Sequence, residues 1–591
     1  MPSSISLRRF WFANCFIVFL FFLIAYQVFQ LTWVHQSSLQ QVAEKQHRLV
    51  VDIPALRGRI LDRAGKEFAS NLKVPSIYAV PRQVSGKDKE ALALKVGQIL
   101  KLDTVFVRER FARDKSFVWL KRKVTAEEAQ TIRQLKNPGL GILEEYKRIY
   151  PQGDLLAQVL GFTDIDGRGL EGIELSLNRD LEGRPGRRFT KRDALGNEIR
   201  AFEKKVIAPV HGHQIYLTVD QYLQYLTERA LDRAFHDWKA KGAAAVLMEA
   251  KTGKILAIAN RPTFNPNEYD KSLPDARRNR AITDMYEPGS VFKIVPGSAA
   301  LNEGLVTFDK TFDCENGEYR YGSRVLHDVH PYGLLTFPEV LIKSSNIGTV
   351  KVAALLAPDI FYRYIQGFGF GVATGIDLPG EAPGFIRPPS QWSATSPYNI
   401  PIGQETMVTA LQMTTAIAVI ANGGNLVRPF ILSKIEDNAG VRLSEKKPEV
   451  VRQGVIRPET ALAMRAILVR AVEEGTGKKA QINGISVGGK TGTAQKVLPG
   501  GRGYSHNNFM SSFIGFAPAE DPELVMAVVV DDPRPLYYGG VVAAPVFKEV
   551  MEAGLLAAGY LPQEEKTSTG LRDVRESSPV MLAPKTSGQA I

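Results

Sequence analysis

The stretch Glu287-Pro288-Gly289-Ser290-Val291-Phe292-Lys293 holds a serine and a lysine three residues apart. Residues with this spacing share one face of a helix, so Lys293 is expected beside Ser290, where an uncharged amine takes the proton of the hydroxyl. Pro288 and Gly289 suit the start of a helix, whose unpaired backbone N–H groups point at the reacting carbonyl. The stretch therefore predicts a serine nucleophile and one half of an oxyanion hole.

Two later strings, Ser344-Ser345-Asn346 and Lys490-Thr491-Gly492-Thr493, complete an ordered set of three. Ser344 offers a hydroxyl for relaying protons, and Asn346 offers an amide that grips a peptide group. Lys490 supplies a second cation, which together with burial favours the neutral form of Lys293. Each string alone is more often an exposed helix face or a turn, but the ordered set predicts a catalytic site.

The string that begins at Lys490 is expected to lie on a β-strand, along which side chains alternate between two faces. Thr491 and Thr493 are predicted to face the cleft and to hold a substrate carboxylate, while Lys490 and Gly492 point to the other side. The backbone N–H of Thr493 completes the oxyanion hole in this interpretation. The preceding pair Gly488-Gly489 is expected to leave space for an extended peptide beside the strand.

The three strings resemble those of the class B penicillin-binding proteins, and within that family the septum-specific transpeptidases are most similar. The likeness runs nearly from end to end of the chain. It also rests on Arg278-Asn279-Arg280-Ala281-Ile282-Thr283-Asp284, Gly403-Gln404-Glu405-Thr406, Gly515-Phe516-Ala517-Pro518 and Tyr537-Tyr538-Gly539-Gly540-Val541-Val542-Ala543-Ala544-Pro545-Val546-Phe547. One feature departs from many relatives: Ile294 and Val295 separate the motif lysine from Pro296, which leaves the local helix geometry open.

The resemblance implies a serine-type D-Ala-D-Ala transpeptidase or carboxypeptidase that crosslinks peptidoglycan stem peptides at the division septum and is a target of β-lactams. Ser290 attacks the carbonyl between the two terminal D-alanines and holds the acyl group until a neighbouring amine takes it. The resemblance implies no cofactor and no metal. The roles it carries over are Lys293 as base, Ser344 as proton relay linked to Lys490, Asn346 as amide clamp, and Thr491, Gly492 and Thr493 as substrate-binding residues.

Several other functions stay open at this point. One alternative is an elongation-specific transpeptidase, which shares the catalytic strings. A β-lactamase or β-lactam sensor is another, because it shares the serine nucleophile. A third is a division scaffold that has lost its catalytic activity and only recruits other division proteins. The family further implies division-machinery partners, among them an FtsW-like polytopic glycosyltransferase.

An uncharged run of 24 residues, Trp11 to Val34, is long enough to cross a hydrocarbon layer as a helix. Arg8 and Arg9 precede it, so the positive-inside rule predicts a cytoplasmic tail over residues 1–10 and an exported remainder. A cleavable signal peptide is the rival interpretation, but the run is long and no Ala-x-Ala site follows. We expect an uncleaved anchor in the bacterial inner membrane over 11–34, followed by a glutamine-rich helical stalk over 35–49.

The remaining chain divides into two predicted domains and a tail. Residues 50–214 resemble the non-catalytic, dimerisation-like pedestal of class B enzymes, and we expect no glycosyltransferase activity there. Arg57, Asp62, Arg63 and Glu174 form either a buried ion network or a partner surface. Residues 215–562 show strand patterns at both ends with helices between, which predicts an α+β domain. Asp220 is expected to cap its first helix, and the apolar runs on either side of the turn at Thr252-Gly253 predict a hairpin. The family resemblance implies the penicillin-recognising fold, an antiparallel sheet flanked by helices. Residues 563–591 are polar and predicted to be disordered.

Charge and cysteine content exclude other classes. The net charge of +12 comes from basic residues spread along the chain, which favours anionic wall polymers or lipid headgroups as partners over nucleic acid. Cys15 lies in the predicted anchor and Cys314 in the exported part, so the two cysteines cannot pair within one molecule. The histidine pairs at 211 and 213 and at 327 and 330 lack supporting ligands nearby and are expected to be loop residues.

Overall fold

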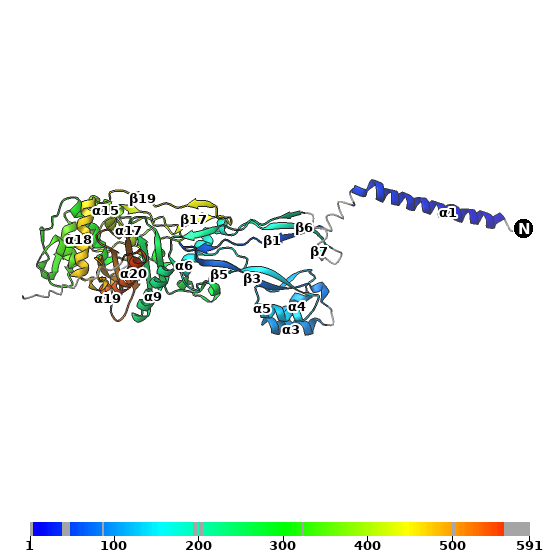
Figure 1. The fold of residues 1–591 in the computed structure, drawn as a ribbon, viewed down its shortest axis with the longest axis horizontal. Helices are drawn as coiled ribbons and strands as arrows, with labels where there is room; N and C mark the ends of the chain where they lie inside the picture. The colour runs from blue at the N-terminus through cyan, green and yellow to red at the C-terminus, as the bar shows by residue number, and fades with distance from the viewer. Residues whose placement is uncertain are drawn as a thin grey trace, which may run out of the picture.

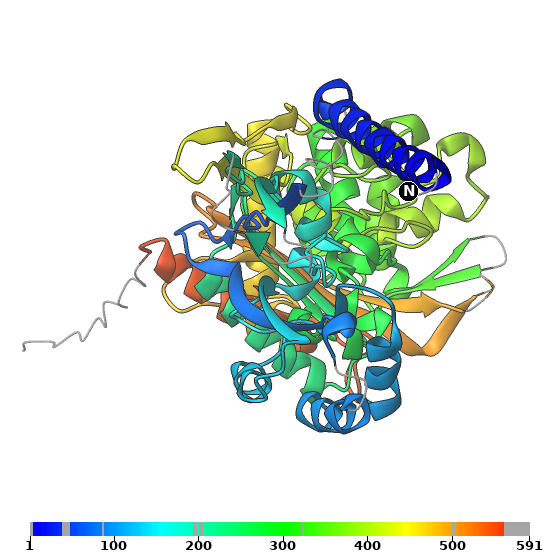
Figure 2. The same ribbon diagram turned by 90° about the vertical axis from the view of Figure 1, so that its right-hand side faces the viewer.

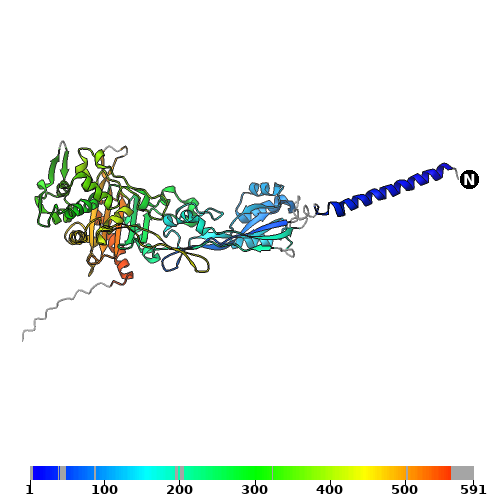
Figure 3. The same cartoon turned by 90° about the horizontal axis from the view of Figure 1, so that it is seen from above.

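The computed structural model describes residues 4–37, 39, 48–84, 88–192, 198–199, 205–321, 324–498, 500 and 503–560. The molecule is elongated, with an N-terminal helix at one end, a narrow pedestal in the middle and a thick helical and sheet domain at the other end (Figures 1 and 3). The predicted tail over 563–591 lies outside the described residues.

The N-terminal helix α1 (Ser4–Phe29) continues into a π-helical turn, Gln30–Val34. Within the segment Arg8–Val34 an 18-residue window has a mean hydropathy of 2.2, and none of that window is buried inside the described structure. It covers the uncharged run predicted as an anchor. Most of the predicted stalk lies outside the described residues, and its last two residues are strand instead of helix, because β1 begins at Arg48 and pairs with a partner strand.

The pedestal contains two sheets and a helical lobe. One sheet joins β1 (Arg48–Ile53), β6 (Gly186–Arg192), β7 (Glu198–Ile199) and β8 (Lys205–Ile207). The other follows the order β18, β17, β9, β2, β3, β4, with β5 also pairing with β3, over Arg442–Glu445, Leu432–Glu436, Gln214–Leu217, Ile60–Leu61, Glu67–Ala79, Val118–Lys121 and Leu140–Ile149. This second sheet joins the pedestal to the catalytic domain, because β17 and β18 come from late in the chain.

The helical lobe of the pedestal lies to one side of the long axis, as the view from the α1 end shows (Figure 2). Its helices are α3 (Lys89–Leu100), α4 (Thr104–Ala112) and α5 (Ala126–Gln134). Three short helices follow β5 and contribute to the large core of the main body: α6 (Ala157–Leu160), α7 (Gly172–Ser176) and α8 (Asn178–Leu181). Thr125 and Glu128 form a capping box that starts α5.

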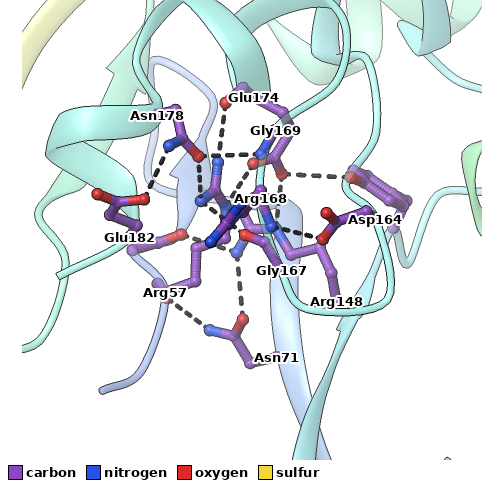
Figure 4. A network of polar contacts seen from close by, with 12 residues as sticks. Arg57, Asn71, Arg148, Asp164, Gly167, Arg168, Gly169, Glu174, Asn178 and Glu182 are labelled. Atoms are coloured by element: carbon purple, nitrogen blue, oxygen red, sulfur yellow. Dashed lines mark hydrogen bonds and ion pairs between the residues drawn. The ribbon is translucent and has the colours of Figure 1, made fainter. Parts of the chain in front are cut away.

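A buried carboxylate holds the pedestal together (Figure 4). Glu174 is fully buried and pairs with Arg57 at 2.6 Å and with Arg148 at 2.6 Å. The predicted network is therefore correct for Arg57 and Glu174 but wrong for its other two members. Asp62 caps a local turn by accepting from the N–H of Ala64 and Lys66, and Arg63 is exposed.

The catalytic domain is built on a five-stranded antiparallel sheet in the order β11, β10, β22, β21, β20. Alternate residues of β10 (Gly242–Glu249) enter two separate cores: Ala244 and Val246 belong to one, Ala245 and Leu247 to the other. The remaining strands are β11 (Ile255–Arg261), β20 (Gly488–Val497), β21 (Tyr504–Ala517) and β22 (Leu524–Asp531). The predicted antiparallel sheet and its hairpin are confirmed.

Helices cover both faces of this sheet. Helix α9 (Gln221–Asp237), capped by Asp220 as predicted, and α20 (Ala544–Ala557) pack on one face. The core on the other face includes α12 (Ile294–Asn302), α14 (Asn346–Ala353), α15 (Pro358–Gly367), α17 (Ala410–Ala421) and α18 (Pro458–Glu473). Smaller elements complete the domain: α10 (Pro274–Arg277), α11 (Arg280–Thr283), α13 (Phe337–Ile342), α16 (Ser396–Asn399), α19 (Gly539–Val542), β12 (Thr311–Asp313), β13 (Glu318–Tyr321), β14 (Arg324–His327), β15 (Leu334–Thr336), β16 (Leu426–Val427) and β19 (Val450–Arg452).

Candidate active site

Ser290 lies on a short 3₁₀ helix, Gly289–Lys293, that leads directly into α12. Residues three apart eclipse each other in a 3₁₀ helix, so Ser290 and Lys293 share one face, as the spacing predicted. The switch to α-helix at Ile294 places Pro296 in the first turn of α12, where its missing N–H removes no hydrogen bond. The unusual position of this proline therefore leaves the helix intact.

The turn before the serine rests on the string that begins at Gly403. Gly289 has a φ of 59° and donates its N–H to the carbonyl of Gly403 at 3.1 Å. A Cβ on Gly403 would lie 2.2 Å from the carbonyl oxygen of Gly289, so only glycine fits there. This close backbone contact fixes the position of the segment that carries Ser290.

Lys293 is completely buried and its amine donates hydrogen bonds to the middle motif. Its Nζ lies 2.6 Å from the carbonyl oxygen of Ser344, 3.3 Å from Ser344 Oγ and 2.7 Å from Asn346 Oδ1. Within the described residues Ser290 Oγ has no hydrogen-bond partner. The second motif thus holds the Lys293 amine, and within the described residues no hydrogen bond joins that amine to Ser290 Oγ.

The third motif contacts the hydroxyl of Ser344, as Lys293 does. Lys490 Nζ donates to Ser344 Oγ at 2.9 Å, so both lysine amines meet at one serine. Ser344 has a φ of 59°, an unusual value for a residue with a side chain. Ser344 lies between α13 and α14, and its hydroxyl contacts both lysine amines.

Burial lowers the pKa of both lysines. The pKa of Lys293 falls well below its ordinary value because the amine is desolvated and because Lys490 lies nearby. Desolvation alone lowers the pKa of Lys490 to about 7. A neutral amine at physiological pH is the form that accepts a proton from a serine hydroxyl, which is the electrostatic condition that the sequence required.

The faces of β20 differ from the expected ones. The alternation is present, but Lys490 and Gly492 lie on the side of the serine-bearing turn: a Cβ on Gly492 would lie 3.0 Å from the carbonyl oxygen of Pro288. Thr491 and Thr493 occupy the opposite side, where Thr491 Oγ1 lies 2.5 Å from Thr476 Oγ1 and Thr493 Oγ1 accepts from Gly539 N at 3.2 Å. Both halves of the predicted arrangement are therefore wrong: Lys490 and Gly492 lie on the side of the serine-bearing turn, and Thr491 and Thr493 lie on the other side.

The two glycines that begin β20 have a packing role. Added Cβ atoms at Gly488 and Gly489 would lie 2.2 Å and 2.5 Å from the rings of Phe516 and Phe513. Both rings belong to the neighbouring strand β21 and are buried. These glycines make room for the sheet's own aromatic side chains, which corrects the interpretation that they clear a path for a substrate peptide.

Asp328 is a site residue that sequence reasoning missed. Its carboxylate accepts from Ser345 Oγ at 2.6 Å, from Ile347 N at 3.1 Å and from the backbone N–H of Asn346. A carboxylate at the start of α14 satisfies the free N–H groups of that helix. Asp328 precedes the motif by 16 residues, counted to Ser344, and no local spacing pattern links the two.

Comparison with family models assigns the two parts of the chain. Residues 243–552 match the penicillin-binding protein transpeptidase domain, and residues 52–217 match the penicillin-binding protein dimerisation domain. The chain belongs to the class B penicillin-binding proteins. It is therefore a peptidoglycan D,D-transpeptidase with an N-terminal dimerisation domain, as the sequence analysis predicted.

Relatives in three organisms support this family membership over nearly the whole chain. Peptidoglycan D,D-transpeptidase FtsI of Escherichia coli K12 is 33% identical over 558 residues, covering 93% of this chain and 91% of the relative. Stage V sporulation protein D of Bacillus subtilis is 35% identical over 572 residues, covering 95% of this chain and 88% of the relative. Penicillin-binding protein 3 of Mycobacterium tuberculosis, solved with ampicillin, has a TM-score of 0.68 at 28% identity and covers 88% of this chain and 98% of that one.

Proposed function

We propose that this class B enzyme crosslinks stem peptides through an acyl-enzyme on Ser290. The observation that carries the proposal is the meeting of two buried lysine amines at Ser344 Oγ, directly beside the 3₁₀ turn that presents Ser290. One desolvated amine is enough to activate a serine, and a second amine linked through a hydroxyl supplies a path for the proton.

The first half of the reaction forms the acyl-enzyme. Neutral Lys293 accepts the proton of Ser290 Oγ, which attacks the carbonyl carbon between the two terminal D-alanines. The backbone N–H groups of Ser290 and Thr493 stabilise the oxyanion. The proton passes through Ser344 and Lys490 to the nitrogen of the departing D-alanine, so the C–N bond breaks as the ester forms.

The second half returns the enzyme to its starting state. The amine of a neighbouring stem peptide attacks the ester carbonyl, its proton returns through the same groups to Ser290 Oγ, and a new amide is released. Water in place of the amine gives a carboxypeptidase reaction. Asn346 is the proposed clamp on the donor's amide. Thr491, Gly492 and Thr493 are the proposed carboxylate site, with the two threonine hydroxyls on the face of β20 opposite the serine-bearing turn, so the carboxylate is bound on that face, away from Ser290 Oγ.

We further propose a septal role for an enzyme anchored in the inner membrane. The similarity to the Escherichia coli division enzyme supports the septum, and the apolar helix Arg8–Val34 with Arg8 and Arg9 at its start supports a single span with the catalytic domain outside. The match of residues 52–217 to a dimerisation domain supports the absence of glycosyltransferase activity. An FtsW-like enzyme then supplies the glycan strands.

Intact-mass and peptide-mapping mass spectrometry test the acyl-enzyme. Full-length protein incubated with benzylpenicillin should gain one penicilloyl mass, mapped to the peptide that contains Ser290. Ser290→Ala should remain unmodified, whereas Ser444→Ala on the exposed strand β18 should be modified like the wild type. A penicilloyl group on another residue, or none at all, contradicts the mechanism. A fluorescent fusion found along the side wall instead of at midcell contradicts the septal role alone.

A further inference from the structure

A cavity of about 210 Å³ lies beside the segment that leads to Ser290. Its wall is formed by residues from the stretch 280–287, by Met407 and Ala410, and by strands β10, β20, β21 and β22. Among the described residues that line it, none belongs to the three catalytic motifs. The cavity is therefore a second hollow of the catalytic domain, separate from the groups to which the transpeptidase reaction is assigned.

Most of the cavity wall is apolar. Met285, Met407 and Met510 line it together with small side chains of the sheet such as Ala244. Met285 is 42% exposed and lies at the mouth, whereas Ala244 is buried. Methionine side chains adapt their shape to different apolar ligands. Since an apolar cavity of about 150 Å³ holds benzene, this one has room for a molecule built on one aromatic ring.

Three polar atoms of residues in this wall are buried and have no hydrogen-bond partner within the described residues. They are Arg280 Nε, the hydroxyl of Tyr286 and Glu287 Oε2, and each of these residues is at most 8% exposed. Buried polar atoms are paired in the great majority of folded proteins. Three unpaired atoms around one cavity indicate that a molecule inside it supplies their partners.

Glu287 is the carboxylate of this wall that lacks a cation. Arg280 pairs with Asp284 at 2.8 Å, and Lys496 pairs with Asp531 at 2.5 Å. Glu287 forms no ion pair within the described residues, and desolvation raises its pKa to about 7. A positively charged N–H donor beside Oε2 would favour the ionised carboxylate and fill the missing place.

The other oxygen of this carboxylate is tied to the loop that supports the serine-bearing turn. Glu287 Oε1 accepts from Glu405 N at 2.8 Å and from Tyr504 Oη at 3.3 Å. Glu405 follows Gly403 by two residues, and the carbonyl of Gly403 accepts the N–H of Gly289. An ionised carboxylate is a stronger acceptor than a neutral one, so a cation at Oε2 tightens this connection.

We propose that the cavity binds a small aromatic amidine or amine, whose cationic head donates to Glu287 and whose ring lies against the three methionines. Binding accelerates acylation of Ser290, because it fixes the turn that presents the hydroxyl. This effect on the rate rests on the proposed acyl-enzyme, whereas the binding itself does not.

Fluorine NMR of para-fluorobenzamidine with the full-length protein tests the site. The probe should bind with a Kd of about 1 mM or tighter. Protein already acylated by benzylpenicillin should still bind it, because the cavity lies outside the catalytic motifs. The anion para-fluorobenzoate, which has the same shape, should not bind. Absence of amidine binding, binding abolished by prior acylation, or equal binding of the anion overturns the proposal.

Substitutions at the mouth and at the carboxylate locate the bound probe. Met285→Trp fills the mouth, and Glu287→Gln removes the charge while keeping the shape, so each should weaken binding at least about tenfold. Leu462→Trp, at an exposed position of α18, should bind the probe like the wild type. Circular dichroism verifies that the variants are folded. Unchanged binding in both Met285→Trp and Glu287→Gln overturns the proposal.

Stopped-flow acylation by a fluorescent penicillin tests the effect on Ser290. Saturating para-fluorobenzamidine should raise the rate at least about twofold in the wild type and have no effect on the rate of Glu287→Gln. An unchanged or lower rate in the wild type overturns the coupling. A protein that binds the probe but is never acylated at Ser290 supports the binding site and contradicts the proposed function instead.

Discussion

Lys490 donates a 2.9 Å hydrogen bond to Ser344 Oγ across 146 residues of sequence. Lys293 approaches the same oxygen at 3.3 Å, so one hydroxyl bridges the amines of the first and third motifs. This bridge links Lys293, the proposed base for Ser290, to the amine of Lys490.

Loss of the bridging hydroxyl should slow acylation without unfolding the enzyme. Ser344→Ala removes the proton path and is expected to lower the second-order acylation rate by about 10²–10⁴-fold. Ser344→Gly removes the same hydroxyl but relieves the backbone strain at a φ of 59°. Stopped-flow acylation by a fluorescent penicillin should show similar losses for both variants. A near-normal rate in the glycine variant contradicts the relay.

Acylation should depend on pH with an acidic limb near neutrality. The pKa of Lys490 is lowered to about 7 and that of Lys293 is lowered as well, so both amines lose their neutral forms as the pH falls through this range. The acylation rate should therefore drop below about pH 7 and level off above it. The check is to measure the acylation rate from about pH 5.5 to about pH 9, a range that brackets this pKa. Circular dichroism at each pH verifies that the protein stays folded. A rate that rises on acidification contradicts the assignment of a neutral base.

The same shift should appear in the stability of the fold. The folded pKa of Lys490 is about 7, below the unfolded value of about 10.4, so between these values the unfolded chain binds one more proton. Stability of the wild type relative to Lys490→Met should thus rise with pH from 7 to 9, by up to about 1.4 kcal/mol per pH unit. Urea denaturation of both proteins at the two pH values measures this difference. A constant difference means that Lys490 stays charged in the folded protein.

Asp328 should support the middle motif. Asp328→Ala leaves Ser345 Oγ and the backbone N–H groups that begin α14 without their acceptor, which costs about 1–3 kcal/mol. Displacement of Asn346 and Ser344 should also slow acylation at least about tenfold. Asp103→Ala, which removes a similar cap from α4 in the pedestal, should destabilise that helix and leave the acylation rate unchanged. Equal acylation rates in the two variants contradict a positioning role for Asp328.

The buried pedestal carboxylate should matter for stability alone. Glu174→Ala leaves Arg57 and Arg148 buried without a counter-charge, so a loss of about 3–5 kcal/mol in the free energy of unfolding is expected. Glu182→Ala, at an exposed position of the same region, should cost far less. Denaturant titration compares the variants, and the acylation rate of folded Glu174→Ala should equal that of the wild type. A small stability loss contradicts the role of Glu174 as the centre of the network.

Local sequence patterns were sufficient to predict several helices and strands and to identify the three motifs. The i, i+3 spacing places Ser290 and Lys293 on one face, and the apolar runs around Thr252-Gly253 predict the hairpin of β10 and β11. These properties depend on residues close together in sequence, where helix and strand periodicity act directly. The same holds for the cap at Asp220 and for the apolar segment that ends at Val34.

Contacts between distant segments were decided by the tertiary structure. The side of β20 that Lys490 occupies depends on which core the strand packs against, and alternation alone cannot distinguish the two faces. The sequence analysis did not predict that Asp328 would bind the middle motif or that Arg148 would pair with Glu174. A carboxylate or guanidinium acts through space on groups that are far away in sequence. The sequence by itself thus determined the three motifs and the groups proposed to carry the chemistry, while folding decided how burial shifts the pKa values of those groups and which neighbours hold them in place.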